Sequence, residues 1–200
     1  MGILNDIGIV VGDKSMAAEV FDNLHGDFRL LKYSSASDYI KHYWESYQKY
    51  SMRNNNLNGK IFEYMLATLL YREGIKPFYL EAKMAFVPNA NFDLLLYSQE
   101  RGPICLSAKT SLRERYKQAD LESIALKQVH RRALCYLVTL SEKEATSVKR
   151  KIKKGEIVGL DKVVVATSPE FDDLIQDLKS NYSYYSPQPV EVITAFRRVD

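Results

Sequence analysis

The feature that most constrains the fold is a change of hydrophobic period after Gly74. Between Leu57 and Tyr71 the apolar residues recur at the spacing of an α-helix, and Gly74 follows them as a stop signal. Downstream, the pattern becomes that of short strands, at Pro77–Val87, Asn91–Tyr97 and Pro103–Thr110. We therefore expect a helix followed by a β-meander.

The rest of the chain alternates between helical and strand-like patterns. In order, the expected elements are a helix at 112–132, a strand at 135–140, a helix at 141–154, a strand at 163–166, a helix at 169–178 and a strand at 190–196. This order predicts an α/β fold with a mixed central β-sheet flanked by helices. No repeat or composition break divides the chain, so we expect a single domain over residues 1–200.

Less can be predicted for the first 56 residues. We expect a helix at 37–48, and the three asparagines at 54–56 are typical of a loop. The only tryptophan, Trp44, lies in this expected helix.

Composition excludes several classes of protein. No apolar run reaches the roughly 18 to 20 residues that cross a bilayer, and the N-terminus lacks a secretory pattern, so we expect a cytoplasmic protein with no membrane partner. The only cysteines, Cys105 and Cys135, lie in apolar stretches. Neither a disulfide framework nor a cysteine-based zinc site is expected.

Positive charge is concentrated in one stretch. The chain has 28 basic and 25 acidic residues, but Lys109–Lys154 contains 13 basic and 5 acidic ones. A localised basic surface favours a polyanion such as nucleic acid, because binding releases condensed counterions. A solvated helix face explains the same charge equally well.

One acidic residue and one lysine are expected to meet at the end of a hairpin. If the second and third strands pair with Tyr97 opposite Ile104, Asp93 falls opposite Ala108 or Lys109. Charges in largely apolar strands are costly to bury unpaired, so Asp93 and Lys109 are candidates for a functional site. A structural acid–lysine pair at a sheet margin is the alternative.

Two further carboxylates lie on the flanking helices. Glu63 precedes Asp93 by 30 residues, and Glu122 follows Lys109 by 13 residues. Carboxylates and a lysine around one point suit metal-assisted phosphodiester hydrolysis, because oxygen ligands hold Mg²⁺ and the metal polarises the phosphate. Taken singly, both glutamates are also typical of solvated helix surfaces.

These residues resemble a known nuclease core. Together with Glu63 and Asp93, the string SAKTSLRERYKQ at 107–118 is similar to the PD-(D/E)xK superfamily, in the branch of restriction endonucleases that read CC:GG sequences (EcoRII-, PspGI- and SsoII-like). That branch has S/T-x-K, an acidic residue 13 positions after the lysine, where this chain has Glu122, and an arginine-acid-arginine triplet, here at 113–115.

Two positions depart from the pattern of that superfamily. Phe92 replaces the proline that usually precedes the first aspartate, and Ser107 stands where the third strand usually has an acidic residue. The resemblance implies that Glu122 supplies the missing carboxylate.

The triplet Arg113, Glu114 and Arg115 can read base edges directly. Arginine binds guanine O6 and N7 bidentately, and a carboxylate accepts a hydrogen bond from cytosine N4. A capping box formed by Ser111 and Glu114 at a helix start is the alternative.

The resemblance implies a type II restriction endonuclease with its catalytic core at about 57–140. It would cut double-stranded DNA at a short palindromic site with a CC:GG core, as a homodimer, with a companion DNA methyltransferase in the host. The implied Mg²⁺ ligands are Asp93, Glu122 and Glu63, with Lys109 as the fourth catalytic residue. The implied DNA contacts are Ser107, Arg113, Glu114, Arg115 and Lys117.

Other interpretations remain open at the level of sequence. A repair or structure-specific nuclease would keep the same core, and a catalytically inactive DNA-binding module would keep only the basic helix. Trp44 either stacks on an extruded base or packs in the core.

Overall fold

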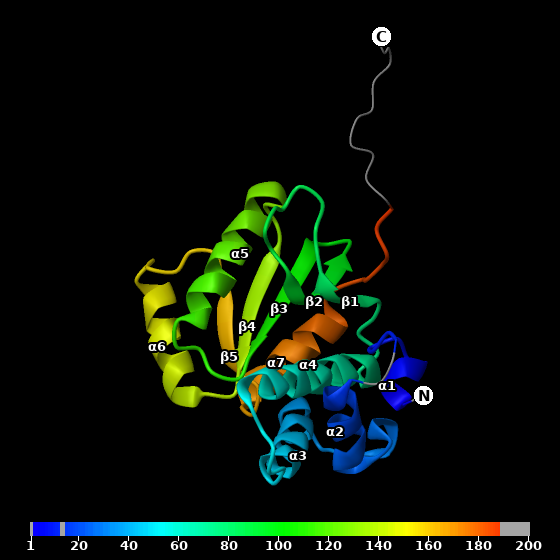
Figure 1. Ribbon diagram of the computed structural model, residues 1–200. Helices are drawn as coiled ribbons and strands as arrows, with labels where there is room; N and C mark the ends of the chain where they lie inside the picture. The colour runs from blue at the N-terminus through cyan, green and yellow to red at the C-terminus, as the bar shows by residue number, and fades with distance from the viewer. Residues whose placement is uncertain (1, 13–14, 189–200) are drawn as a thin grey trace.

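The structure, a computed structural model, describes residues 2–12 and 15–188 (Figure 1). These ranges contain the helices α1 (Ile3–Asp6), α2 (Met16–His25), α3 (Ala36–Gln48), α4 (Asn55–Arg72), α5 (Arg115–Val129), α6 (Glu142–Lys153) and α7 (Pro169–Ser180), and a 3-10 helix at Phe28–Leu30. The strands are β1 (Phe78–Ala82), β2 (Phe92–Ser98), β3 (Gly102–Lys109), β4 (Leu134–Thr139) and β5 (Lys162–Val165). The strand expected at 190–196 lies outside the described residues.

The strands form one mixed sheet in the order β1-β2-β3-β4-β5. The pairs β1–β2 and β2–β3 are antiparallel, whereas β3–β4 and β4–β5 are parallel. Parallel neighbours need a crossover connection, which α5 and α6 provide. The prediction of an α/β fold with a mixed central sheet flanked by helices is confirmed.

Helices cover both faces of the sheet (Figure 1). Side chains alternate along β3, so that Leu106 and Ala108 pack in one core with α4 and α7, while Cys105 packs in the other core with α5 and α6. Helices α2 and α3 lie on the far side of α4 from the sheet. Two apolar cores therefore hold the strands from opposite sides, and only the strand ends are left for polar chemistry.

Two element boundaries differ from the sequence-based expectation. The loop expected at 54–56 is wrong, because the side chain of Asn54 accepts a hydrogen bond from the Leu57 amide and caps α4, which begins at Asn55. β1 ends at Ala82 and does not extend to Val87. In the loop that follows it, Phe86 has a φ of 64° and lies outside the strands.

The hairpin register differs from the expected one by a single residue. Tyr97 pairs with Pro103 and not with Ile104. Gly102 pairs with Ser98 and has a φ of 75°, which glycine adopts readily and which lets the chain turn within three residues. The shift still leaves Asp93 at the end of the hairpin beside Lys109.

Trp44 is half-buried against one core, and both cysteines lie in the other. Trp44 packs against Tyr47 of the same helix, α3, with 5.4 Å between the ring centroids. Cys105 and Cys135 are buried free thiols on the paired strands β3 and β4. Within residues 2–12 and 15–188, no helix combines the length and apolar character needed to cross a bilayer.

Candidate active site

The site is centred on an ion pair between the start of β2 and the end of β3. The Nζ atom of Lys109 lies 2.6 Å from Oδ2 of Asp93, and the Ala108 amide donates to the same oxygen at 2.8 Å. The Asp93 and Lys109 side chains are 16% and 15% exposed. The expectation that these two residues meet at the hairpin end is confirmed.

The position of this pair follows from the strand pattern. Asp93 and Lys109 are the polar ends of otherwise buried strands, where the sheet passes from core to solvent. A charge at such a margin is stabilised only when it is paired, and each of these two residues supplies the partner of the other.

Glu122 approaches the pair from the middle of α5. Burial raises the pKa of its carboxyl, and the negative charge of Asp93 raises it further, while Gln118 and Lys109 oppose the shift. Gln118 donates to Oε1 of Glu122 at 2.9 Å, one helical turn away. The carboxylate is therefore half-buried, oriented by its own helix and within electrostatic reach of both members of the ion pair.

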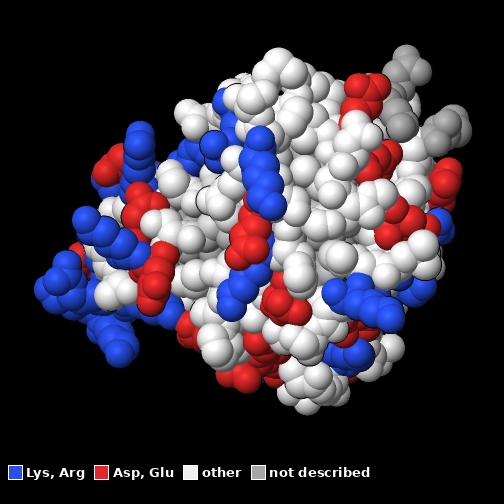
Figure 2. Space-filling model, turned by 90° about the horizontal axis from the view of Figure 1, so that it is seen from below, with Lys and Arg blue, Asp and Glu red and all other residues white. Residues whose placement is uncertain are grey.

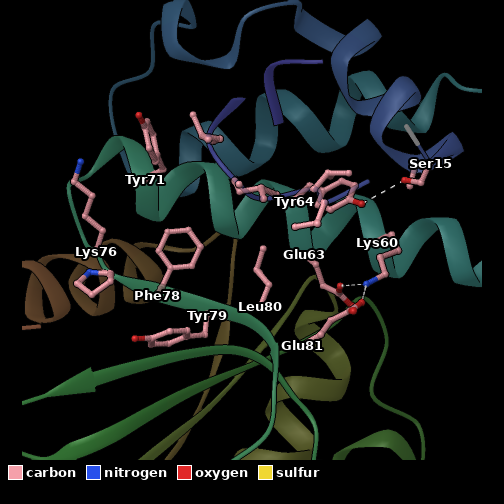
Figure 3. Close-up of a pocket in the computed structure, with 17 residues that line it drawn as sticks. Ser15, Lys60, Glu63, Tyr64, Tyr71, Lys76, Phe78, Tyr79, Leu80 and Glu81 are labelled. Carbon is pink, nitrogen blue, oxygen red and sulfur yellow. Dashed lines mark hydrogen bonds and ion pairs between the residues drawn. The ribbon is translucent and has the colours of Figure 1, made fainter. Parts of the chain in front are cut away.

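Glu63 approaches from α4 on the other side of the sheet. Its side chain is 16% exposed and accepts from Lys60 at 2.9 Å, and Lys60 also pairs with Glu81 on β1. Figure 3 shows both carboxylates directed at the Lys60 ammonium, at one end of a groove of about 750 Å³. Burial raises the pKa of Glu63 despite the bond from Lys60, and Asp93 contributes to the increase.

Two of the three carboxylates, those of Asp93 and Glu122, are available to coordinate a hard divalent cation. Within the described residues no three acidic, histidine or cysteine side chains are grouped closely enough to hold a metal ion. Glu63 is already bound by Lys60. However, Oδ1 of Asp93 and Oε2 of Glu122 accept no hydrogen bond from a described residue. Mg²⁺ is commonly held by one or two carboxylates with phosphate oxygens and water, so this donor set fits it.

The arginine-acid-arginine triplet lies exposed where the chain enters α5. Helix α5 begins at Arg115 with Glu114 as its N-cap residue, and no side chain caps it. The alternative of a capping box with Ser111 is therefore wrong, and Glu114 instead pairs with Lys117. Arg113 has a φ of 30°, which is strained for a residue other than glycine.

Glu144 on α6 holds this turn in place. Its carboxylate accepts from the amides of Leu112 at 2.8 Å and Arg113 at 3.2 Å. The hydrogen bond from the Leu112 amide lowers the pKa of Glu144. The backbone that presents the triplet is thus held by a residue 31 and 32 positions downstream of the two amides, which sequence reasoning did not find.

A second anchor fixes α5 in the region of Glu122. Oδ1 of Asp120 accepts from the amides of Gly159 at 2.6 Å and Leu160 at 3.2 Å. A β-carbon at position 159 would lie 2.4 Å from the Asp120 carbonyl oxygen, so only glycine fits there. Gly159 is the sequence signal that could have indicated this close approach of the loop to the backbone of α5.

The other expected DNA contacts differ in accessibility. Ser107 is 3% exposed and packs beside Cys105, so the direct DNA contact expected of it is not available in this structure. Strand alternation places the Ser107 side chain on the same face of β3 as Cys105, the face that α5 and α6 cover. Lys117 is largely exposed, at 61%, and lies next to the triplet.

Basic side chains gather on one side of the molecule. Figure 2 shows Lys and Arg clustered on the side where α6 lies in Figure 1, while acidic and basic residues are mixed over the rest of that face. Lys151 of this helix lies 5.5 Å from the ring centroid of Tyr116 on α5, and Lys149 pairs with Glu170. Some of the basic stretch is therefore neutralised within the fold, and the remainder faces solvent.

The fold and the site define an α/β protein with an acid–lysine pair at one end of a mixed sheet and a second carboxylate within electrostatic reach of that pair. No protein-family model, curated protein sequence or solved structure matches this chain.

Proposed function

We propose that the protein is a metal-dependent endonuclease that hydrolyses phosphodiester bonds of double-stranded DNA at a short palindromic site with a CC:GG core. The observation that carries the proposal is the Asp93–Lys109 ion pair at one end of the sheet, with the half-buried Glu122 carboxylate within electrostatic reach of both residues. The exposed triplet that starts four residues after Lys109 supports it.

In this proposal Asp93 and Glu122 would hold Mg²⁺, which, when bound, polarises the scissile phosphate and makes a water molecule acidic. Lys109 orients the attacking water and offsets the negative charge that develops on the phosphate. Gln118 orients the Glu122 carboxylate. Glu63, which is also within electrostatic reach of Asp93 and Lys109, would add negative charge beside the metal, while the hydrogen bond from Lys60 keeps its carboxylate out of direct coordination.

Recognition is assigned to the triplet. Arg113 and Arg115 would bind guanine in the major groove, and Glu114 would accept from cytosine amino groups. Because one chain carries one such triplet and one set of metal-binding carboxylates, a palindromic site requires a homodimer with one half-site for each subunit. A companion methyltransferase that protects the host site is part of the same proposal.

Digestion of plasmid DNA by the purified protein with Mg²⁺ tests the proposal. We expect discrete fragments whose sequenced ends share CC and GG flanks, from a protein that light scattering shows to be a dimer. A smear, or cutting only at branched or damaged DNA, would instead identify a repair or structure-specific nuclease. Binding without cutting in Mg²⁺ or Mn²⁺ would leave only a DNA-binding module.

A further inference from the structure

A second polar hollow lies at the end of the sheet opposite the ion pair. It has a volume of about 460 Å³ and lies between the β2–β3 turn, the α5–β4 connection and the C-terminal segment. Since β3 spans eight residues, this hollow is about 23 Å from Lys109 along the strand. Aromatic and basic side chains dominate its lining: Tyr97, Arg101, His130, Arg131, Arg132 and Tyr185.

The aromatic side chains of the hollow pack against one another. The Tyr97 ring meets the Tyr185 ring edge to face, at 5.4 Å and 87°, and meets the His130 ring at 6.4 Å and 90°. The Tyr185 amide donates to the Tyr97 carbonyl at 3.1 Å, and the Gln99 amide donates to the Ser183 carbonyl at 3.0 Å. These two hydrogen bonds hold residues 183–185 against the β2–β3 hairpin and place Tyr185 at the hollow.

The positive charge of the hollow is not neutralised within the described residues. Arg101, Arg131 and Arg132 make no ion pair there, whereas the nearby Glu100 uses both carboxylate oxygens to accept from the Ser183 amide, at 3.1 and 3.0 Å. Burial lowers the pKa of His130, so its ring is neutral near pH 7 and free to donate or accept a hydrogen bond. Three guanidinium groups around one hollow favour an anion.

We propose that this hollow binds a nucleotide unit, with its phosphate on the guanidinium groups and its base against Tyr97 and Tyr185. Guanidinium groups match phosphate oxygens bidentately, and the faces of aromatic rings stack on any base. The volume lies within the range of about 300 to 1,000 Å³ that is usual for small-ligand sites. The unit is either a free nucleotide or part of a DNA strand, and the proposal holds whether or not the protein is a nuclease.

Isothermal titration of the full chain with three probes tests the charged half of the site. The probes are inorganic phosphate, thymidine 5′-monophosphate and 5′-phosphorylated dithymidine. We expect the Arg131→Ala/Arg132→Ala variant to bind both nucleotides about tenfold more weakly or worse. The matched control, Lys153→Ala/Lys154→Ala, removes the same charge from the exposed end of α6 and is expected to bind as the wild type does.

A second variant tests the aromatic half. Tyr185→Leu keeps the backbone hydrogen bond and is expected to weaken nucleotide binding about fivefold or more, with phosphate binding unchanged. Tighter binding of the dinucleotide than of the mononucleotide would identify a DNA strand as the source, and the reverse a free nucleotide. The proposal is overturned if the wild type binds neither nucleotide, if it binds phosphate as tightly as the nucleotides, or if the arginine variant and its control behave alike. The titrations do not depend on cleavage, so a failure of nucleotide binding and a failure of the proposed nuclease activity are distinguishable.

Discussion

Lys109 and the Ala108 amide both bind one oxygen of Asp93, Oδ2, at 2.6 and 2.8 Å. Oδ1 of the same carboxylate accepts no hydrogen bond from a described residue. One side of the carboxylate is therefore fixed by the sheet, while the other side is available to a ligand. The protein contains a second acid–lysine pair in which one carboxylate oxygen likewise accepts both bonds, and it serves as a comparison.

That pair is Asp161 with Lys127. Oδ2 of Asp161 accepts from Lys127 at 2.8 Å and from the Cys135 amide at 2.7 Å, which is nearly the same local chemistry at the start of β4. We expect Asp93→Asn and Asp161→Asn each to lower the free energy of unfolding by about 1 to 3 kcal/mol, because each weakens charge-assisted hydrogen bonds. Chemical denaturation measures both changes.

Cleavage is expected to separate the two variants. Asp93→Asn should reduce plasmid cleavage by about 100-fold or more, while gel-shift affinity for DNA is kept or raised because a negative charge near the phosphates is removed. Asp161→Asn should cut at the wild-type rate when folded. Equal cleavage by the two variants would show that Asp93 is only structural.

Replacing Glu122 is expected to reduce cleavage without reducing the stability of the fold. Its pKa is raised by burial, so the folded protein binds a proton there more readily than the unfolded chain does. Stability is then lost as pH rises from the ordinary glutamate pKa, about 4.3, through the raised value. Glu122→Gln removes this cost, and its thermal midpoint at pH 7 should equal or exceed that of the wild type, while cleavage falls about 100-fold or more. Normal cutting by this variant would remove Glu122 from the metal site.

The triplet makes a separate prediction about specificity. Arg113→Ala and Arg115→Ala should each cost about 1 to 3 kcal/mol of binding to CC:GG duplexes and much less to unrelated duplexes. Lys117→Ala should weaken binding to all duplexes by a similar factor and lower the salt dependence, as for a phosphate contact. Competition gel shifts at several salt concentrations measure both effects. An equal loss on all duplexes for the arginine variants would contradict base reading.

Glu144 should influence recognition without touching DNA. Glu144→Gln weakens the bonds from the Leu112 and Arg113 amides and should lower the free energy of unfolding by about 1 kcal/mol, together with specific affinity. Because the pKa of Glu144 is lowered in the folded state, its contribution is present above the ordinary glutamate pKa and is lost as pH falls through the lowered value. Denaturation of both proteins from pH 7 to pH 3 should therefore bring their stabilities together. A constant difference would contradict this role of Glu144.

Much of the fold could be predicted because its signals are local. Periodicity over ten or more residues located α3, α4 and α7, and short buried runs located β4 and β5. Helix α1 was not predicted because four residues are too few to show a period, whereas α2 has a periodic apolar face and a capping serine, Ser15, that were overlooked. The expected hairpin register was wrong by one residue. The register depends on the positive φ of Gly102, and a glycine permits that conformation but does not require it.

The candidate site was predictable only in part. The meeting of Asp93 and Lys109 follows from strand pairing, which is close in sequence. The bonds from Glu144 to the Leu112 turn and from Asp120 to the Gly159 loop join residues more than 30 positions apart, and no local pattern encodes them. Lys60 was missed for a similar reason, because its partner Glu81 lies on another element.

Helix α5 carries both Arg115, at its first residue, and Glu122, two turns later. On the proposed function, the helical rise fixes how far the base that is read lies from the bond that is cut, at about 10 Å along the axis. Inserting one residue between them would rotate the carboxylate by about 100° relative to the arginine. Substrate choice could then be altered by exchanging side chains on this helix, whereas changing its length would uncouple reading from cutting.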